Sequence, residues 1–526
     1  MALIATLMMI TVFLILVGVL MENLAKEVKV SGMHGRSNGA LRGAYYAVEA
    51  MQYQIEFNDA GAAPGVAPAP MNGTFNDVNG DVVAWNVNVD AMRWNSVLPY
   101  YMVHASATDG TSIRSVDALL QKMPFSAYNY FTISEMTNLG GAVVYTNGEN
   151  FNGPVYSGGP MNIDYQSGNP NPIFSNEVWT VSTPNWIPAA PSSAADWSSI
   201  IQTQGNFHIV GQPLQLPTSL DNTAAMDAAL TGNPKPASPP VLPSSQGMYI
   251  NNANVVGGGG TLNSGVYFVG CTQVSSSVAG SVDSFTFKIF ASYTGGPTYG
   301  CTGAAVTYHM NVDTAGNTTT ITDAGNNPVA SYTGIPSGQL PPGTSGEAGA
   351  IWSTGGYQFA ANNVYEGQYT FAVPDDAGNH PPVVFNGSQS YDLASAANDE
   401  LAFWSNDMLL ADTVNGNIEI DGLLLTGYYG ECGGTCNDGT FYNPYCPAGN
   451  PVCVAPGGTG ILTLKGSLVE NVRGKRGTLG SSITGFSTDS VYDSRLASKP
   501  PPFTPTTTEY DIVAICTTDA GTTCGQ

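Results

Sequence analysis

Positive charge is scarce in this sequence. Lys and Arg number 15 against 39 Asp and Glu, so the 526 residues carry a net charge of −24. Contacts with nucleic-acid phosphates need clustered Lys and Arg, and this balance therefore excludes a broad nucleic-acid-binding surface. It fits a cell-surface or secreted protein that has to stay soluble.

Catalytic motifs are also missing. The five His residues stand alone, with no H-x-x-x-H or H-E-x-x-H pair, and there is no G-K-[ST] phosphate loop or G-x-S-x-G turn. Carboxylate pairs such as Asp375 with Asp376, or Asp407 with Asp412, could act as glycosidase acids, but turn and surface positions explain them as well. We expect no enzyme activity, no cofactor and no metal site.

Cysteine is absent from the first 270 residues and then occurs eight times. An even number in a chain with the composition of an exported protein favours disulfides. We expect the four residues between 432 and 453 to form one local unit and Cys516 to pair with Cys524. The alternative for the four is a zinc site with thiolate ligands, although no His lies nearby. The residues assigned to disulfides are Cys271, Cys301, Cys432, Cys436, Cys446, Cys453, Cys516 and Cys524.

The N-terminal segment is the one long helical pattern. Residues 1–21 contain no charge, and as a helix they would span about 31 Å, the thickness of one hydrocarbon core. No basic stretch precedes this run and no A-x-A site follows it, which argues against a cleaved signal peptide. The pattern continues without Pro to about residue 57, so we expect a membrane helix that later packs against copies of itself.

Four glycines form a stripe on this helix, at intervals of three and four residues. Each costs roughly 0.5–1 kcal/mol of helix stability, so the stripe needs a reason. Close approach of helices through small residues is one; a loosened segment or a hinge is another. The positions assigned to the assembly helix are Met1, Ala5, Gly18, Gly32, Gly35, Gly39, Gly43 and Glu49.

The opening M-A-L-I-A-T-L, the apolar run and the later Ala47-Val48-Glu49-Ala50 resemble the PilX-like branch of type IV pilins. The resemblance implies that a short leader is removed just before the apolar run, which makes Met1 the processed end. It also implies a departure, because Ala5 stands where most major pilins carry a Glu that pairs with a neighbour's terminal amine. That departure favours a minor subunit.

The rest of the chain predicts a mainly β fold, because Gly (62), Pro (35) and Tyr (26) are abundant. Alternating residues in 72–122, with turns at Asn79-Gly80 and Asp109-Gly110, predict a small antiparallel sheet. Apolar bursts about eight residues apart near 401–425 predict successive rungs of a β-solenoid without a strict repeat. The expected domains are a helix (1–57), a linker and pilin-type sheet (58–126), a β-solenoid-like domain (127–455) with a Cys-rich insertion (430–455), and C-terminal strands with a tail (456–526).

Three segments are similar to large solenoid-bearing pilins of the same branch: 151–157 (FNGPVYS), 417–425 (NIEIDGLLL) and 491–510, which begins VYDSRL. The resemblance implies that the solenoid is inserted into the pilin sheet and that the C-terminal strands return to that sheet. Members of this group are linked to DNA uptake, which gives interest to one basic cluster. Its candidate DNA contacts, which could equally pair with local acids, are Lys465, Arg473, Lys475 and Arg476.

Surface glycans are a further expectation. Three Asn residues lie in N-x-[ST] sequences, and a Thr-Pro-rich tract resembles an O-glycan site. The candidates are Asn72, Asn317, Asn386, Thr504, Thr506, Thr507 and Thr508.

Together these features predict a structural component of an extracellular type IV pilus-like filament. Its partners would be other pilin subunits, with the inner membrane as its location before assembly. The alternative is a minor tip pilin that binds DNA or a surface.

Overall fold

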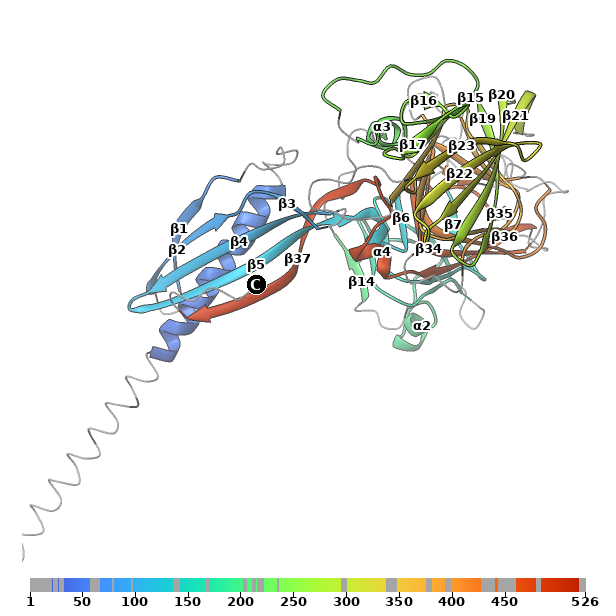
Figure 1. Cartoon of the computed structure of the whole chain (residues 1–526). Coiled ribbons are helices and arrows are strands. Elements are labelled where there is room, and N and C mark those ends of the chain that lie inside the picture. Colours follow the sequence, from blue (N-terminus) through green and yellow to red (C-terminus); the bar gives the residue numbers. More distant parts are fainter. Residues whose placement is uncertain are drawn as a thin grey trace, which may run out of the picture. The chain divides into compact units, whose positions relative to one another are not determined.

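The computed structural model divides the chain into two compact units, which are described separately (Figure 1). The first comprises Met1–Arg93, Pro99–Lys122 and Glu509–Gln526, and the second Trp94–Leu98 and Met123–Thr508. The structure describes residues 21, 27, 33–56, 67–77, 80–95, 98–135, 142–165, 171–201, 206–210, 214, 222–233, 236–294, 300–336, 348–374, 381–392, 399–411, 413–426, 440–442, 460–478 and 484–519.

The first unit is a helix on an antiparallel sheet. The helix covers residues 33–56, and Figure 1 shows it lying across one face of the sheet. Strands follow the order β1-β2-β4-β5-β37, and β3 pairs with β4. Their bounds are β1 Met71–Asn76, β2 Val82–Val89, β3 Arg93–Asn95, β4 Leu98–Asp109, β5 Ser112–Pro124 and β37 Thr506–Asp519. The antiparallel sheet predicted for residues 72–122 is therefore present, and it gains its last strand from the C-terminal region.

Alternation builds the core of this unit. Every second residue of β2 is buried, because successive side chains of a strand point to opposite faces. Ala44, Val48, Met51 and Ile55 of the helix are buried against the sheet in the same cluster. The predicted Asp109-Gly110 turn closes β4 on β5, and Gly110 has a φ of +57°, a conformation that Gly adopts without steric cost.

The glycine stripe has a different role from the one expected. A Cβ on Gly43 would lie 2.6 Å from Val83 Cγ1 and 2.7 Å from the Ala107 Cβ, and a Cβ on Gly39 would lie 2.1 Å from Asp109 Oδ2. These two glycines bring the helix close to its own sheet. Their assignment to helix–helix packing between subunits was wrong, since the space is already filled. Gly35 has nothing within 4 Å, and Gly32 lies outside the described residues.

The second unit is built from three rows of parallel strands. Row 1 holds β18 Val266–Val269, β24 Ala348–Ser353, β27 Gln368–Ala372, β30 Glu400–Trp404, the second halves of β32 Ile418–Thr426 and β34 Gly460–Val472, then β6 Tyr130–Ser134, β9 Val155–Ser157, β12 Val178–Thr180 and β14 Phe207–Ile209. Row 2 holds β19 Cys271–Ala279, β25 Tyr357–Phe359, β28 Val383–Phe385, β31 Asp407–Leu410 and β33 Thr440–Tyr442. Row 3 holds β26 Asn363–Tyr365, β29 Gln389–Tyr391, the first halves of β32 and β34, β36 Thr484–Tyr492, β8 Asn150–Asn152 and β11 Ile173–Phe174.

Smaller elements complete this unit. A parallel trio consists of β7 Val144–Tyr145, β10 Asn162–Tyr165 and β13 Asn185–Pro188. Antiparallel strands extend row 2 from β19 as β20 Val282–Thr294, β21 Gly300–Asp313, β22 Thr318–Asp323 and β23 Pro328–Thr333, which pairs in parallel with β17 Gly259–Thr261. The remaining elements are β15 Gly247–Ile250, β16 Ala253–Asn254, β35 Gly477–Thr478, α2 Ala194–Ser198, α3 Thr223–Thr231, α4 Arg495–Ser498 and a 3₁₀ turn at Phe125–Ala127.

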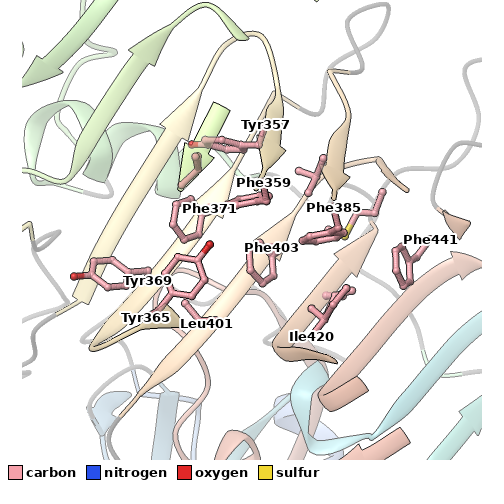
Figure 2. Packing of buried hydrophobic residues seen from close by; sticks show 14 of the residues in the cluster. Tyr357, Phe359, Tyr365, Tyr369, Phe371, Phe385, Leu401, Phe403, Ile420 and Phe441 are labelled. Atoms are coloured by element: carbon pink, nitrogen blue, oxygen red, sulfur yellow. The ribbon is translucent and has the colours of Figure 1, made fainter. Parts of the chain in front are cut away.

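One column of side chains runs in register through row 1 and faces the main core. Each member lies opposite the next in the neighbouring parallel strand. In order they are Val266, Ile351, Phe371, Phe403, Leu424, Leu468, Tyr130, Val155, Val178 and Phe207. Phe359 of row 2 packs edge-on against Phe371 and Phe403, with ring centroids 5.1 and 5.0 Å apart, as Figure 2 shows.

The predicted rung spacing was wrong. The bursts eight residues apart fall in different rows, since β30 belongs to row 1, β31 to row 2 and the start of β32 to row 3. Neighbours in row 1 are much farther apart along the chain: Phe371 and Phe403 are 32 residues apart, and Phe403 and Leu424 are 21 apart. The return of 456–526 to the small sheet also holds only for β37, because β34 to β36 belong to the second unit.

Glycines let two strands pass from row 3 to row 1. Gly422 in β32 and Gly466 in β34 have φ values of +112° and +143° and lie opposite each other. A Cβ on Gly466 would lie 2.1 Å from the Gly422 carbonyl oxygen. Only Gly allows this stacking of two bends.

Some expectations fall outside the described residues. They concern Met1, Ala5, Gly18, Cys432, Cys436, Cys446, Cys453 and Cys524. In the part that the structure describes, no helix is long and apolar enough to cross a membrane. Disulfide chemistry is present: Cys271 and Cys301 are bonded across 30 residues, and Cys516 is also disulfide-bonded.

Replacing Gly43 by Ala should destabilise the first unit. The added methyl overlaps Val83 and Ala107, so we expect the free energy of unfolding to fall by about 1–3 kcal/mol. Urea unfolding monitored by circular dichroism measures this change. Gly35→Ala in the same helix is the control, and it should raise stability by roughly 0.5–1 kcal/mol. Equal effects of the two substitutions would contradict the packing role of Gly43.

Candidate functional sites

The basic segment after β34 is buried. Arg473 is 2% exposed, and its Nη2 donates to both carboxylate oxygens of Glu149, at 2.9 and 3.1 Å. Its Nη1 lies 3.5 Å from Glu135 Oε2, and the guanidinium carbon lies 3.5 Å from the centre of the Tyr145 ring. A cation held between two carboxylates and an aromatic face is strongly paired.

Arg476 belongs to the same buried network. Its Nη2 donates to the Tyr130 hydroxyl at 2.8 Å and lies 3.4 Å from Glu470 Oε2. The Tyr130 hydroxyl in turn donates to Glu470 Oε2 at 2.7 Å, and Glu470 Oε1 accepts from the backbone N–H groups of Phe441 and Gly474. The network ties β6, β33 and β34 together.

Burial controls the electrostatics of this network. It raises the pKa of Glu470 above its usual range, although Arg476 and the two backbone donors oppose the shift. It also raises the pKa of Tyr130 and Tyr145 well above the ordinary value, so both hydroxyls remain protonated donors. For Arg473, burial alone would lower the pKa, but Glu149 and its other neighbours raise it well above the ordinary value.

The assignment of this segment to DNA contact was therefore wrong for Arg473 and Arg476, because neither guanidinium can reach a phosphate. Lys475 is half-buried and Lys465 is paired with Asp421 at 3.5 Å. One signal in the sequence could have shown this: the buried positions carry Arg, which forms forked ion pairs, and the more exposed ones carry Lys.

A second charged cluster was not predicted. Glu400 and Asp421 are 2% and 1% exposed, and they pair with the partly exposed Lys499 (2.9 Å) and Lys465 (3.5 Å). Lys465 and Arg495 both lie over the ring of Tyr391, at 5.5 and 5.4 Å from its centre. We call Glu400, Asp421, Tyr391, Lys465, Arg495 and Lys499 the carboxylate cluster.

Burial dominates the titration of this cluster. It raises the pKa of Glu400 to about 7, against the opposing hydrogen bond and charge of Lys499. It likewise raises the pKa of Asp421 to about 7, opposed by the Tyr391 backbone N–H and by Lys465. No signal in the sequence marks these two acids, because their burial depends on strands that pair across distant segments.

The glycan candidates differ in accessibility. Asn72 and Asn317 are exposed. Asn386 donates through Nδ2 to the Phe359 carbonyl at 2.7 Å, and the buried Thr507 donates to the Met123 carbonyl at 2.9 Å. A glycan on Asn386 or Thr507 would break these bonds, so both assignments were wrong. Thr504 and Thr506 are half-buried, and the side chain of Thr508 lies outside the described residues.

The outward side of helix 33–56 is unusually apolar. Met33, Tyr45 and Tyr53 are 57%, 36% and 61% exposed, and Glu49 is exposed between them. Tyr46 lies partly against Phe75 and Trp85. Large apolar side chains gathered on one surface mark an interaction site.

Metal and catalytic residues were also sought. Among the described residues, no group of three or more His, Cys, Asp and Glu side chains could hold a metal ion. Asp407 is buried at 8% exposure, whereas Asp375, Asp376 and Asp412 lie outside the described residues.

Comparison with known proteins gives little. No family model matches the sequence, and no match among curated proteins was found. One solved structure, the competence-associated pilin ComZ from Thermus thermophilus, aligns with 92% of this chain and 98% of its own, at 13% identity and a TM-score of 0.29. A likeness of this degree carries no argument about the fold or the function.

Arg476→Ala should destabilise the second unit rather than weaken a surface contact. Glu470 would be left buried without its cation, so we expect a loss of about 3–5 kcal/mol in the free energy of unfolding. Lys475→Ala, one residue away, should change it by less than about 0.5 kcal/mol. Urea unfolding of both variants tests this difference, and similar small losses in both would refute the buried network.

Glu400→Gln should alter the pH dependence of stability. The folded pKa of Glu400 is about 7 against an ordinary 4.5, so between these values the folded state binds more protons than the unfolded state and stability falls as pH rises. We expect the wild type to lose on the order of 3 kcal/mol relative to the variant from pH 4.5 to above 7. Parallel stability curves for the two proteins would contradict the burial of this acid.

Proposed function

We propose that the protein is a subunit of an extracellular type IV pilus-like filament, assembled through its N-terminal helix. The observation that carries this proposal is the two-sided character of helix 33–56. Its small side, rich in Ala and Gly, is filled by its own sheet, while Met33, Tyr45 and Tyr53 remain exposed on the other side.

Such an outward face suits a second helix. Exposed Tyr and Met side chains supply large contact areas at interfaces, and the face continues from the uncharged run of residues 1–21. The partners would be other subunits of the filament, with anchoring in the inner membrane before assembly and the cell surface as the final location.

We also infer that the three rows of parallel strands form a β-solenoid. The chain visits rows 1, 2 and 3 in turn through β24, β25 and β26, then again through β27, β28 and β29. Turns of this kind stack without a free hydrophobic face between them. Segments 130–209 and 348–492 would be two parts of one stack, because Leu468 lies opposite Tyr130.

A tip subunit is the second candidate, favoured by Ala5 at the position where major pilins carry a Glu. Its ligand would be a surface rather than DNA, because Arg473 and Arg476 are buried. Abundance separates the two: a structural subunit recurs along the filament, whereas a tip subunit is rare.

Tyr45→Glu should keep the protein folded but exclude it from filaments. A charge placed on the outward helix face would be buried without a partner on assembly, whereas in the free protein it stays in water. The measurement is mass spectrometry of sheared filaments together with urea unfolding of the purified protein.

Val256→Glu in the second unit is the matched control, since Val256 is 68% exposed and lies far along the chain from the helix. It should enter filaments normally. Incorporation of the Tyr45→Glu variant at the wild-type level would rule out assembly through this helix face.

A further inference from the structure

Lys465 and Asp421 lie opposite each other in the paired parallel strands β34 and β32. Lys465 Nζ is 3.5 Å from Asp421 Oδ2, and the two side chains are 33% and 1% exposed. An amine and a carboxyl group thus meet at a place that is closed to water on the carboxyl side.

The surroundings of Asp421 are unusual for a simple surface ion pair. Its Oδ2 accepts the Tyr391 backbone N–H at 2.9 Å, and its Oδ1 accepts no hydrogen bond from a described donor. A second carboxyl group, that of Glu419, faces it within hydrogen-bonding reach once one of the two acids is protonated. The ring of Tyr391 lies 5.5 Å from Nζ.

We propose that Lys465 Nζ and Asp421 Cγ are joined by an isopeptide bond, which makes this pair a self-modification site. An amide between the two side chains removes a charged pair from a poorly hydrated position, where separate charges are costly. It also ties β32 to β34 covalently, in the row where both strands bend at glycine.

The reaction needs no cofactor or oxidant. A proton passes from the Lys465 ammonium to the Asp421 carboxylate, which gives a neutral amine beside a neutral acid. The nitrogen lone pair then attacks Cγ, the C–OH bond breaks, and the hydroxyl leaves as water with a proton taken from nitrogen. Glu419 carries that proton between the two groups, and the balance is one amide formed and one water released.

The pair formed by Lys499 and Glu400 is a useful contrast. Its atoms are closer, at 2.9 Å, but Lys499 follows the short helix α4 and does not lie opposite Glu400 in a paired strand. Its side chain is 43% exposed. It therefore remains an ion pair and serves as the internal control.

Intact mass of the reduced full chain tests the proposal. The wild type should be lighter than its sequence by one water, and a tryptic digest should contain a branched peptide that joins the segments around residues 421 and 465. Trypsin should not cleave after Lys465. A wild-type chain with the full mass and cleavage after Lys465 would overturn the proposal.

Substitutions assign the bond. Lys465→Arg keeps the positive charge and the ion pair, but the guanidinium is not a nucleophile, so this variant should fold and show the full mass. Asp421→Ala should also show the full mass, and Glu419→Gln should accumulate unlinked chain. Lys499→Arg should keep the loss of water. If the loss persists in Lys465→Arg, the bond lies elsewhere and the assignment fails; the branched peptide of the wild type decides the matter if a variant does not fold.

Discussion

The second unit depends on one interaction, the in-register stacking of apolar side chains between parallel strands. Many of its strands have only three or four residues, too few to be stable alone. Stacking gives each short strand a buried neighbour above and below, and each buried Phe or Leu contributes roughly 1.5–3 kcal/mol. Because the contribution comes from the column, the chain can leave and re-enter the stack, and residues 130–209 can continue a row begun by residues 266–472.

The same stacking explains where charges are placed. Within a row, every backbone group is paired with the strands on either side, so a polar side chain has to find its partner among nearby side chains or at a bend. Glu470 and Asp421 lie at such places, beside the end of β34 and beside the Gly422 bend. Both are held by backbone N–H groups as well as by a cation, which is what a buried carboxylate requires.

The sequence could predict what depends on local pattern. Alternation and Asp-Gly chemistry located the strands of 72–122, and composition indicated a mainly β chain. It could not predict which strands are neighbours, because the insertions between successive turns vary in length and hide the repeat. The burial of Arg473 and Arg476 depends on Glu135 and Glu149, more than 300 residues earlier. The glycine stripe was found correctly, but its partner, the sheet formed by β2 and β4, could not be identified from helix spacing alone.

The helix of the first unit combines two kinds of packing that exclude each other on one face. Close contact with a sheet needs small residues, and Gly39, Gly43, Ala44 and Ala47 supply them. A face made only of such residues offers little area to a second partner. The opposite face therefore carries the large side chains, and their exposure in the isolated subunit costs solubility that the acidic charge of the chain offsets. Since the small residues are already used by the sheet, any partner of this helix has to be recognised by its aromatic side.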